Sequence, residues 1–208
     1  ARTPDPDAAP VSPIEDSIAN WLRSAEPEGT LLRVWPMGGG ISSAMTAFTF
    51  SRDDEEHTLV LRQPNDWSLT NVPDLVADEF SRLDTLHRGG LPVPAPVFRD
   101  TTGVHFGRPG LVLEYIEGSP ELNPQDRSSY LDQFARQLAD IHHFDAMSPG
   151  LSLAETTTHE AAVSQDTTMP QADPELQLAR IREVLAAHAS VPSTNARALL
   201  HGDFWPGN

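Results

Sequence analysis

The pattern of apolar and polar residues changes near residue 30 from a helical period to a strand-like alternation. Before this point, residues 13–25 place four apolar side chains on one helical face. These side chains are Ile14, Ile18, Trp21 and Leu22. Ser12 and Glu15 have the spacing of a capping box, and Pro13 suits the first helical position. We therefore predict a short helix that docks on another part of the protein through this apolar stripe.

Alternating apolar residues then predict three strands, at about residues 31–37, 46–51 and 58–64. A helix is expected at roughly residues 73–88, and two further strands are expected at about residues 97–100 and 110–116. The proline-rich segment 91–97 is unsuited to a central strand and should be an extended connection, because proline cannot donate a ladder hydrogen bond. This order predicts a five-stranded antiparallel lobe with one main helix.

The second half of the chain returns to a helical period. Residues 124–144 place Leu131, Phe134, Leu138 and Ile141 on one face, and another helix is expected to begin at Asp173-Pro174. We therefore predict an α+β protein in three parts. These parts are a tail with the docking helix (1–29), an N-lobe (30–117) and a partial, mainly helical C-lobe (118–208).

Composition limits the chemistry that this chain can perform. The net charge of -16 disfavours a nucleic-acid surface, which needs clustered positive charge. All 14 basic residues are arginine, so a Schiff base and a P-loop, which both need lysine, are excluded. The absence of cysteine excludes thiolate metal sites and cysteine nucleophiles. Without a long apolar run or a signal sequence, we expect a cytoplasmic protein with no membrane partner.

The segment HGDFWPGN, residues 201–208, contains an aspartate and an asparagine at a spacing found in phosphate chemistry. Protein kinases have this His-x-Asp-x-x-x-x-Asn spacing in the catalytic loop, where Asp accepts the proton of the substrate hydroxyl and Asn binds magnesium. Asp203 and Asn208 occupy these positions. Taken alone, the segment is equally compatible with an ordinary turn.

The predicted N-lobe contains candidates for a phosphate site. A glycine-rich loop joins the first two strands, and its backbone N–H groups, helped by two serine hydroxyls, are suited to contact phosphates. The loop residues are Gly38, Gly39, Gly40, Ser42 and Ser43. The alternative is a simple hairpin turn.

Arg62 ends the third predicted strand, where kinases have a phosphate-binding lysine. Glu79 on the next helix is its candidate ion-pair partner, with Asp78 as a rival, although both groups could instead be solvated. Glu114, Tyr115 and Ile116 follow the fifth strand, where a hinge could pair with an adenine edge; a plain edge strand is the alternative. These features together, in kinase order, favour a protein-kinase-like fold.

The segments GGGISSAMTAFTF, VLRQP, LVLEYIEG and HGDFWPGN resemble the aminoglycoside phosphotransferase family, which also includes choline, homoserine and fructosamine kinases. The resemblance implies a kinase that uses ATP or GTP with Mg²⁺ and acts on a small hydroxyl acceptor. It assigns Asp203 as catalytic base, His201 as support for the loop, and Asn208 as a magnesium ligand. Arg62, paired with Glu79, would contact the nucleotide phosphates.

Two departures from the family qualify this expectation. Arg62 replaces a lysine that many relatives have, and the family's second magnesium-binding aspartate follows the catalytic loop, beyond Asn208. We therefore expect the 208 residues alone to be inactive and a longer native protein to be a kinase. A pseudokinase or nucleotide-binding module is the alternative. A protein kinase is a less favoured interpretation, because Gly202 stands where protein kinases have the arginine of their His-Arg-Asp motif. The acceptor is not set by this sequence.

Overall fold

The computed structural model describes residues 13–38, 42–151, 153 and 197–205. The chain divides into two units, residues 1–151 with 199–208 and residues 152–198, and only the first is described in detail below. The helix expected from Asp173-Pro174 lies outside the described residues. Among the described residues, no helix has the length and apolar character needed to span a membrane.

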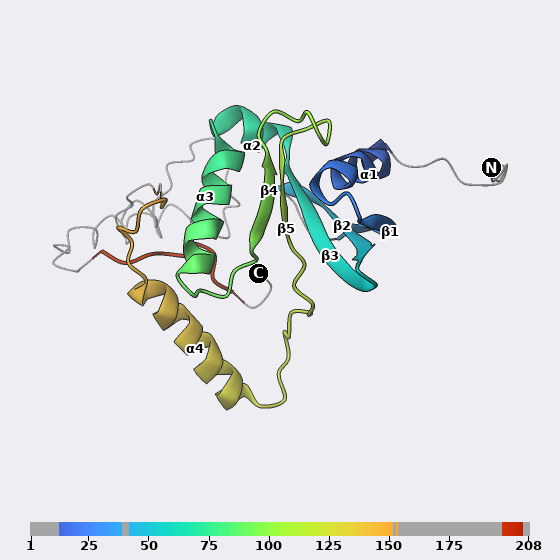
Figure 1. Cartoon of the computed structure of the whole chain (residues 1–208). Coiled ribbons are helices and arrows are strands. Elements are labelled where there is room, and N and C mark those ends of the chain that lie inside the picture. Colours follow the sequence, from blue (N-terminus) through green and yellow to red (C-terminus); the bar gives the residue numbers. More distant parts are fainter. Residues whose placement is uncertain (1–12, 39–41, 152, 154–196, 206–208) are drawn as a thin grey trace, which may run out of the picture. The chain divides into compact units, whose positions relative to one another are not determined.

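Five strands form one antiparallel sheet in the order β1-β2-β3-β5-β4 (Figure 1). Their bounds are β1 Thr30–Met37, β2 Ser43–Arg52, β3 Glu55–Pro64, β4 Pro96–Asp100 and β5 Gly110–Glu114. Asp53 and Asp54 both adopt positive φ, which gives the tight β2–β3 turn the conformation that favours a hairpin. The prediction of a five-stranded antiparallel sheet is therefore confirmed.

Helix α1, Pro13–Ala25, covers one face of the sheet and begins at the predicted proline. Ile18, Trp21 and Leu22 are buried in a cluster that includes Phe48 from β2. Trp21 lies edge-on to Phe48 at a ring-centroid distance of 6.0 Å. Full burial of side chains of this size stabilises a fold by roughly 1.5–3 kcal/mol each. The predicted docking helix is therefore part of the core of the lobe.

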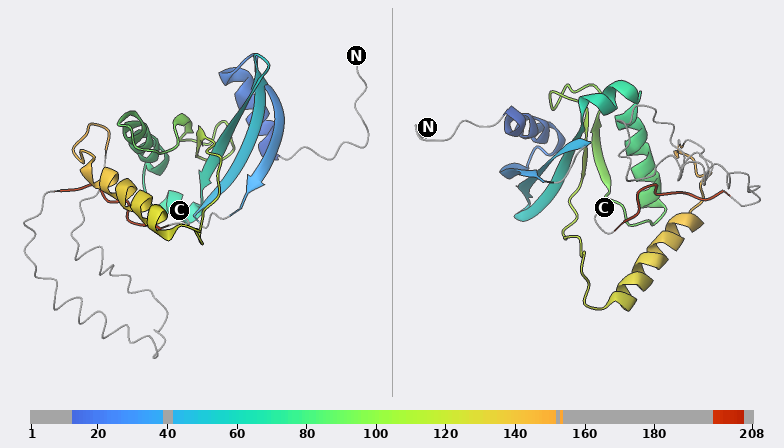
Figure 2. Two further views of the ribbon diagram at one scale, coloured as in Figure 1. Left: turned by 90° about the horizontal axis from the view of Figure 1, so that it is seen from below. Right: turned by 180° about the vertical axis from the view of Figure 1, so that it is seen from behind.

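Helix α3, Leu75–Arg88, packs against the opposite face of the sheet, as Figures 1 and 2 show. Val76 of α3 lies with Leu111 and Leu113 of β5 in a second buried cluster. Alternate residues of each strand therefore point towards α1 or towards α3, as the period of two requires. We call the second side the α3 face.

The structure corrects the predicted helix at residues 73–88 in two ways. A separate short helix, α2 Asp66–Asn71, precedes α3, and it begins after Asn65, whose side chain accepts a hydrogen bond from the Ser68 backbone N–H. Val72 is extended, the conformation that a following proline imposes, and Asp74 is left-handed with φ 57°. The helical period therefore restarts at Leu75 rather than at residue 73.

The remaining boundaries shift by a few residues. Strand β4 begins at Pro96, inside the segment expected to be a connection, and β4 is an edge strand, where proline is tolerated. Strand β5 ends at Glu114, two residues earlier than predicted. Helix α4 spans Arg127–His143 within the predicted range, but its Leu131 is 62% exposed rather than packed. The proposed domain boundaries at residues 29 and 117 stay predictions.

Candidate active site

The α3 face of the sheet carries Arg62 in a row of residues from four strands. The strand register places Met37, Met45, Arg62 and Leu111 in line from β1 to β5. Because side chains alternate, all four belong to the same face as Leu111, whose side chain packs with α3. Strand pairing therefore brings the Arg62 guanidinium to the side of the sheet on which Glu79 of α3 lies.

The Arg62 guanidinium is fixed by two side chains. Its Nη1 forms an ion pair with Glu79 Oε1 at 2.6 Å, and its Nε donates a hydrogen bond to Ser43 Oγ at 3.3 Å. Glu79, rather than its neighbour Asp78, is the partner, and its side chain is only 14% exposed. A partly buried pair of this kind is screened less by salt than a surface pair. The two contacts thus orient the guanidinium through its Nη1 and Nε nitrogens.

The glycine-rich loop is described only at its two ends. Gly38 follows β1, and Ser42 precedes β2, whereas Gly39 and Gly40 lie outside the described residues. Ser42 is exposed, and its carbonyl accepts a hydrogen bond from the Asn65 backbone N–H at 2.9 Å. Ser43 is 9% exposed and contacts Arg62, so the structure links it to the arginine of the predicted phosphate site.

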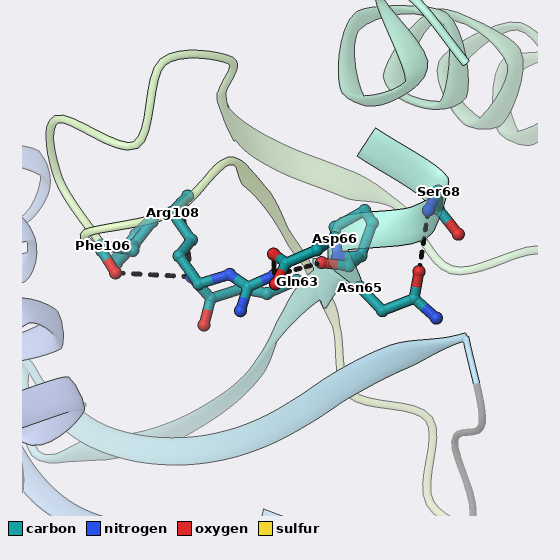
Figure 3. Close-up of polar contacts among 7 residues, drawn as sticks. Gln63, Asn65, Asp66, Ser68, Phe106 and Arg108 are labelled. Carbon is teal, nitrogen blue, oxygen red and sulfur yellow. Dashed lines mark hydrogen bonds and ion pairs between the residues drawn. The ribbon is translucent and has the colours of Figure 1, made fainter. Parts of the chain in front are cut away.

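The end of β3 is held by the loop that joins β4 to β5 (Figure 3). Gln63 Nε2 donates to the carbonyls of Phe106 and Arg108, at 3.4 and 3.3 Å. Arg108 Nη2 donates to the Pro64 carbonyl at 3.2 Å and pairs with Asp66 Oδ1 at 2.5 Å. The backbone on the C-terminal side of Arg62 is therefore fixed from a loop more than 40 residues away in sequence.

Asp100 organises this β4–β5 loop from within. Asp100 is 3% exposed, and its carboxylate accepts hydrogen bonds from five backbone N–H groups, those of Thr102, Gly103, Val104, His105 and Phe106. Burial by itself raises the pKa of Asp100, but the hydrogen bonds from the loop, led by those of His105 and Phe106, outweigh burial and lower the pKa. The ionised Asp100 carboxylate therefore holds the backbone of the β4–β5 loop in place.

The predicted hinge follows β5 directly. The Glu114 backbone N–H donates to the Ala95 carbonyl at 2.9 Å, and the Glu114 carboxylate accepts from the Ala95 N–H at 3.0 Å. Tyr115 is half-buried and lies edge-on to Trp35 of β1 at 6.2 Å, while Ile116 is 58% exposed. Because the Glu114 amide is used within the fold, a base edge would have to pair with other backbone groups of this segment.

The catalytic-loop candidates lie in the segment that follows the buried Leu199. His201, Gly202 and Asp203 are exposed, and His201 Nδ1 accepts a hydrogen bond from the Asp203 backbone N–H at 3.3 Å. Gly202 has φ 82°, a conformation that a residue with a Cβ rarely adopts, and this explains why glycine suits the position. Phe204 packs on Phe134 of α4 at a centroid distance of 4.3 Å. Asn208 lies outside the described residues.

Sequence patterns missed the residues that support Arg62 indirectly. The contact between the Ser43 hydroxyl and the Arg62 guanidinium was not predicted, and direct contact of Ser43 with phosphate stays a prediction. Gln63 and Arg108 had no recognisable signal, because their partners are backbone carbonyls. The close approach of Gly110 to β3 offered one weak signal, since a Cβ there would lie 2.9 Å from the Arg62 carbonyl oxygen.

The order of these features in the chain is that of a kinase-like phosphotransferase. The model of the phosphotransferase enzyme family matches residues 38–208, which is well over half of the chain. The chain therefore belongs to the phosphotransferase enzyme family. None of the curated proteins matches the sequence significantly.

Solved structures with the same architecture include spectinomycin phosphotransferase, APH(9)-Ia, in complex with ADP and spectinomycin. It has a TM-score of 0.55 and 12% identity over 93% of this chain and 64% of its own length, which supports the protein-kinase-like α+β fold. A candidate aminoglycoside phosphotransferase from Ralstonia eutropha JMP134 has a TM-score of 0.47 and 20% identity over 63% of this chain. The chain spans 64% and 38% of the lengths of these two proteins.

Proposed function

We propose that the protein is a small-molecule kinase that transfers the γ-phosphate of ATP or GTP to a hydroxyl group of a small metabolite or an aminoglycoside-like acceptor. The observation that carries the proposal is the Arg62–Glu79 ion pair, formed on the α3 face of a chain of the phosphotransferase enzyme family. An oriented guanidinium is a suitable donor for phosphate oxygens. The ADP bound to spectinomycin phosphotransferase supports a nucleotide as the ligand.

Asp203 is the proposed catalytic base. Its exposed position would let the carboxylate orient the acceptor hydroxyl and take its proton as the phosphoryl group is transferred. His201 supports the loop through its contact with the Asp203 backbone. We place the reaction in the cytoplasm, with a nucleotide and a small hydroxyl compound as the partners and no nucleic acid or membrane involved.

Magnesium is the proposed metal, and Asn208 is its proposed ligand, with a side-chain oxygen of the type that magnesium prefers. The described residues contain no group of three or more acidic, histidine or cysteine side chains placed to hold a metal ion. When bound, magnesium would neutralise charge on the phosphates.

A coupled assay of ADP release tests these proposals with a panel of acceptors that includes aminoglycosides, choline, amino alcohols and sugars. We expect one acceptor class to stimulate ADP release. ADP binding without transfer to any acceptor would indicate a nucleotide-binding module or pseudokinase instead.

A further inference from the structure

Arg62 is held through two different nitrogens, and this arrangement could not be formed by a lysine. Nε contacts Ser43 and Nη1 contacts Glu79. A lysine side chain has one nitrogen, Nζ, and therefore has no second donor at the position of the arginine Nε. Among the described residues, the side-chain partners of the guanidinium contact Nε and Nη1, so Nη2 is the nitrogen placed to contact a ligand.

We propose that Ser43 is a positioning residue that aims the Arg62 guanidinium at the nucleotide phosphates. This inference rests on the proposed function, since it assumes that Arg62 binds phosphate. Glu79 by itself fixes one end of the guanidinium and leaves it able to rotate about that contact. The bond from Nε to the Ser43 hydroxyl removes this rotation and directs the remaining Nη2 edge.

The position of Ser43 is itself well determined. Ser43 is the first residue of β2 and lies opposite Pro64 in the β2–β3 register. The preceding carbonyl, that of Ser42, accepts the Asn65 N–H at 2.9 Å. Ser43 is 9% exposed, so its hydroxyl has little freedom to turn towards solvent.

The backbone that follows Arg62 in β3 is fixed by polar contacts with the β4–β5 loop (Figure 3). Gln63 donates to the Phe106 and Arg108 carbonyls, and Gly110 allows β5 to lie close to the Arg62 carbonyl. With both backbones fixed, the direction of the guanidinium depends on its side-chain partners. The Ser43 hydroxyl therefore acts through Arg62, rather than by direct contact with the phosphate.

A double-mutant cycle with Ser43→Ala and Arg62→Lys tests this inference by calorimetric titration with ADP and with adenosine. The ratio of the two affinities isolates the phosphate contribution, which a general loss of structure would not change selectively. In the Arg62 background, we expect Ser43→Ala to lower the ratio about three- to tenfold, as the loss of one side-chain hydrogen bond gives. In the Arg62→Lys background, we expect Ser43→Ala to change it less than about twofold, because no Nε remains to be held.

Two further variants complete the test. Ser43→Thr, which keeps the hydroxyl, should retain the wild-type ratio, and Ser51→Ala, a serine at the other end of β2, should leave it unchanged. Equal losses from Ser43→Ala in both backgrounds would mean direct phosphate contact and would overturn the inference, as would no loss in the Arg62 background. If Arg62→Ala leaves the ratio of ADP to adenosine affinity unchanged, the proposed phosphate role of Arg62 fails. If Arg62→Ala lowers this ratio but the Ser43→Ala and Arg62→Lys effects are independent, only the proposed role of Ser43 fails.

Discussion

Arg62 and Asp203 belong to two regions of the candidate site that are held in different ways. The Arg62 guanidinium contacts two side chains, lies beside a nearly buried carboxylate, and extends from a strand fixed by a distant loop. Asp203 is exposed in a segment that follows a left-handed glycine and packs on α4 through Phe204.

This difference suggests a division of roles between the two regions. A group that binds a charged ligand gains affinity when it is oriented beforehand, because less entropy is lost on binding. A group that must reach an acceptor hydroxyl needs to be accessible. The predictions below separate the two roles, beginning with the largest effect.

The largest effect is expected from Asp203→Asn in a turnover-competent form of the protein. The amide cannot accept the hydroxyl proton, so kcat should fall by about 100-fold or more, the scale of general-base catalysis. The affinity for ADP should stay within about twofold, since the change leaves the N-lobe intact. Steady-state kinetics and calorimetry measure the two quantities. Asp132→Asn, on exposed α4, is the matched control, and near-wild-type kcat in Asp203→Asn would refute the base assignment.

Arg62→Ala should affect nucleotide binding by the region around Arg62 rather than the region around Asp203. Loss of a charged donor to phosphate should weaken ADP binding by about 10- to 100-fold, as hydrogen bonds to charged groups imply. Adenosine binding should change little. The control is Arg88→Ala, which removes an arginine whose side chain is 77% exposed and whose partner is Asp84 of the same helix. Equal effects of the two substitutions would show that Arg62 has no special role.

Asp100→Asn tests whether the rigidity of the N-lobe depends on the β4–β5 loop. The amide keeps one oxygen acceptor but loses the second and the negative charge, so the free energy of unfolding should fall by about 1–3 kcal/mol. Denaturant titration measures this change. Asp145→Asn, at an exposed loop position, is the control. An unchanged denaturant midpoint of unfolding for Asp100→Asn would show that the Asp100 carboxylate is not needed for stability.

The same carboxylate predicts an acid dependence. Because the pKa of Asp100 is lowered in the folded protein, its stabilising contribution is fully present above the ordinary Asp pKa of about 3.9. The contribution is lost as the pH falls below that value and through the folded-state pKa. The stability difference between wild type and Asp100→Asn should therefore narrow under acidic conditions, and a widening difference would contradict the assignment.

The smallest effect is expected from Phe134→Leu. This change removes the ring that packs on Phe204 but keeps an apolar side chain, so about 0.5–1.5 kcal/mol of aromatic packing is lost. We expect a modest fall in kcat, because the loop that carries Asp203 is less well placed, with unchanged ADP affinity. Weaker ADP binding with unchanged kcat would show that α4 supports nucleotide binding rather than the placement of Asp203.

Much of the fold was predictable because it follows from local periodicity. The alternation of residues in β2 and β3 and the apolar stripe of α1 correspond to faces that are buried in the structure, whereas β1 contributes only the partly buried Leu31 and Val34. The break between α2 and α3 was not predicted, since it depends on Asp74 adopting a left-handed conformation within an otherwise helical pattern. The start of β4 at Pro96 depends on its edge position, which is a property of the whole sheet.

The candidate site was predictable where a motif has fixed spacing and not where contacts cross the fold. Arg62 and Glu79 were both identified, and the strand register and α3 bring them together. The contacts of Ser43 with Arg62 and of Gln63 with the β4–β5 loop depend on three-dimensional proximity that no local pattern encodes.

The measurement that tests the central claim most directly is the stoichiometry of phosphoryl transfer. A turnover-competent form of the protein is incubated with ATP labelled at the γ-phosphate and with the acceptor found by the panel assay, and the products are analysed by mass spectrometry. We predict one labelled phosphoryl group on an acceptor hydroxyl for each ADP released, and neither product with Asp203→Asn. ADP released without a phosphorylated acceptor, or the same products from Asp203→Asn, would contradict the assignment of this chain as a phosphotransferase with Asp203 as its base.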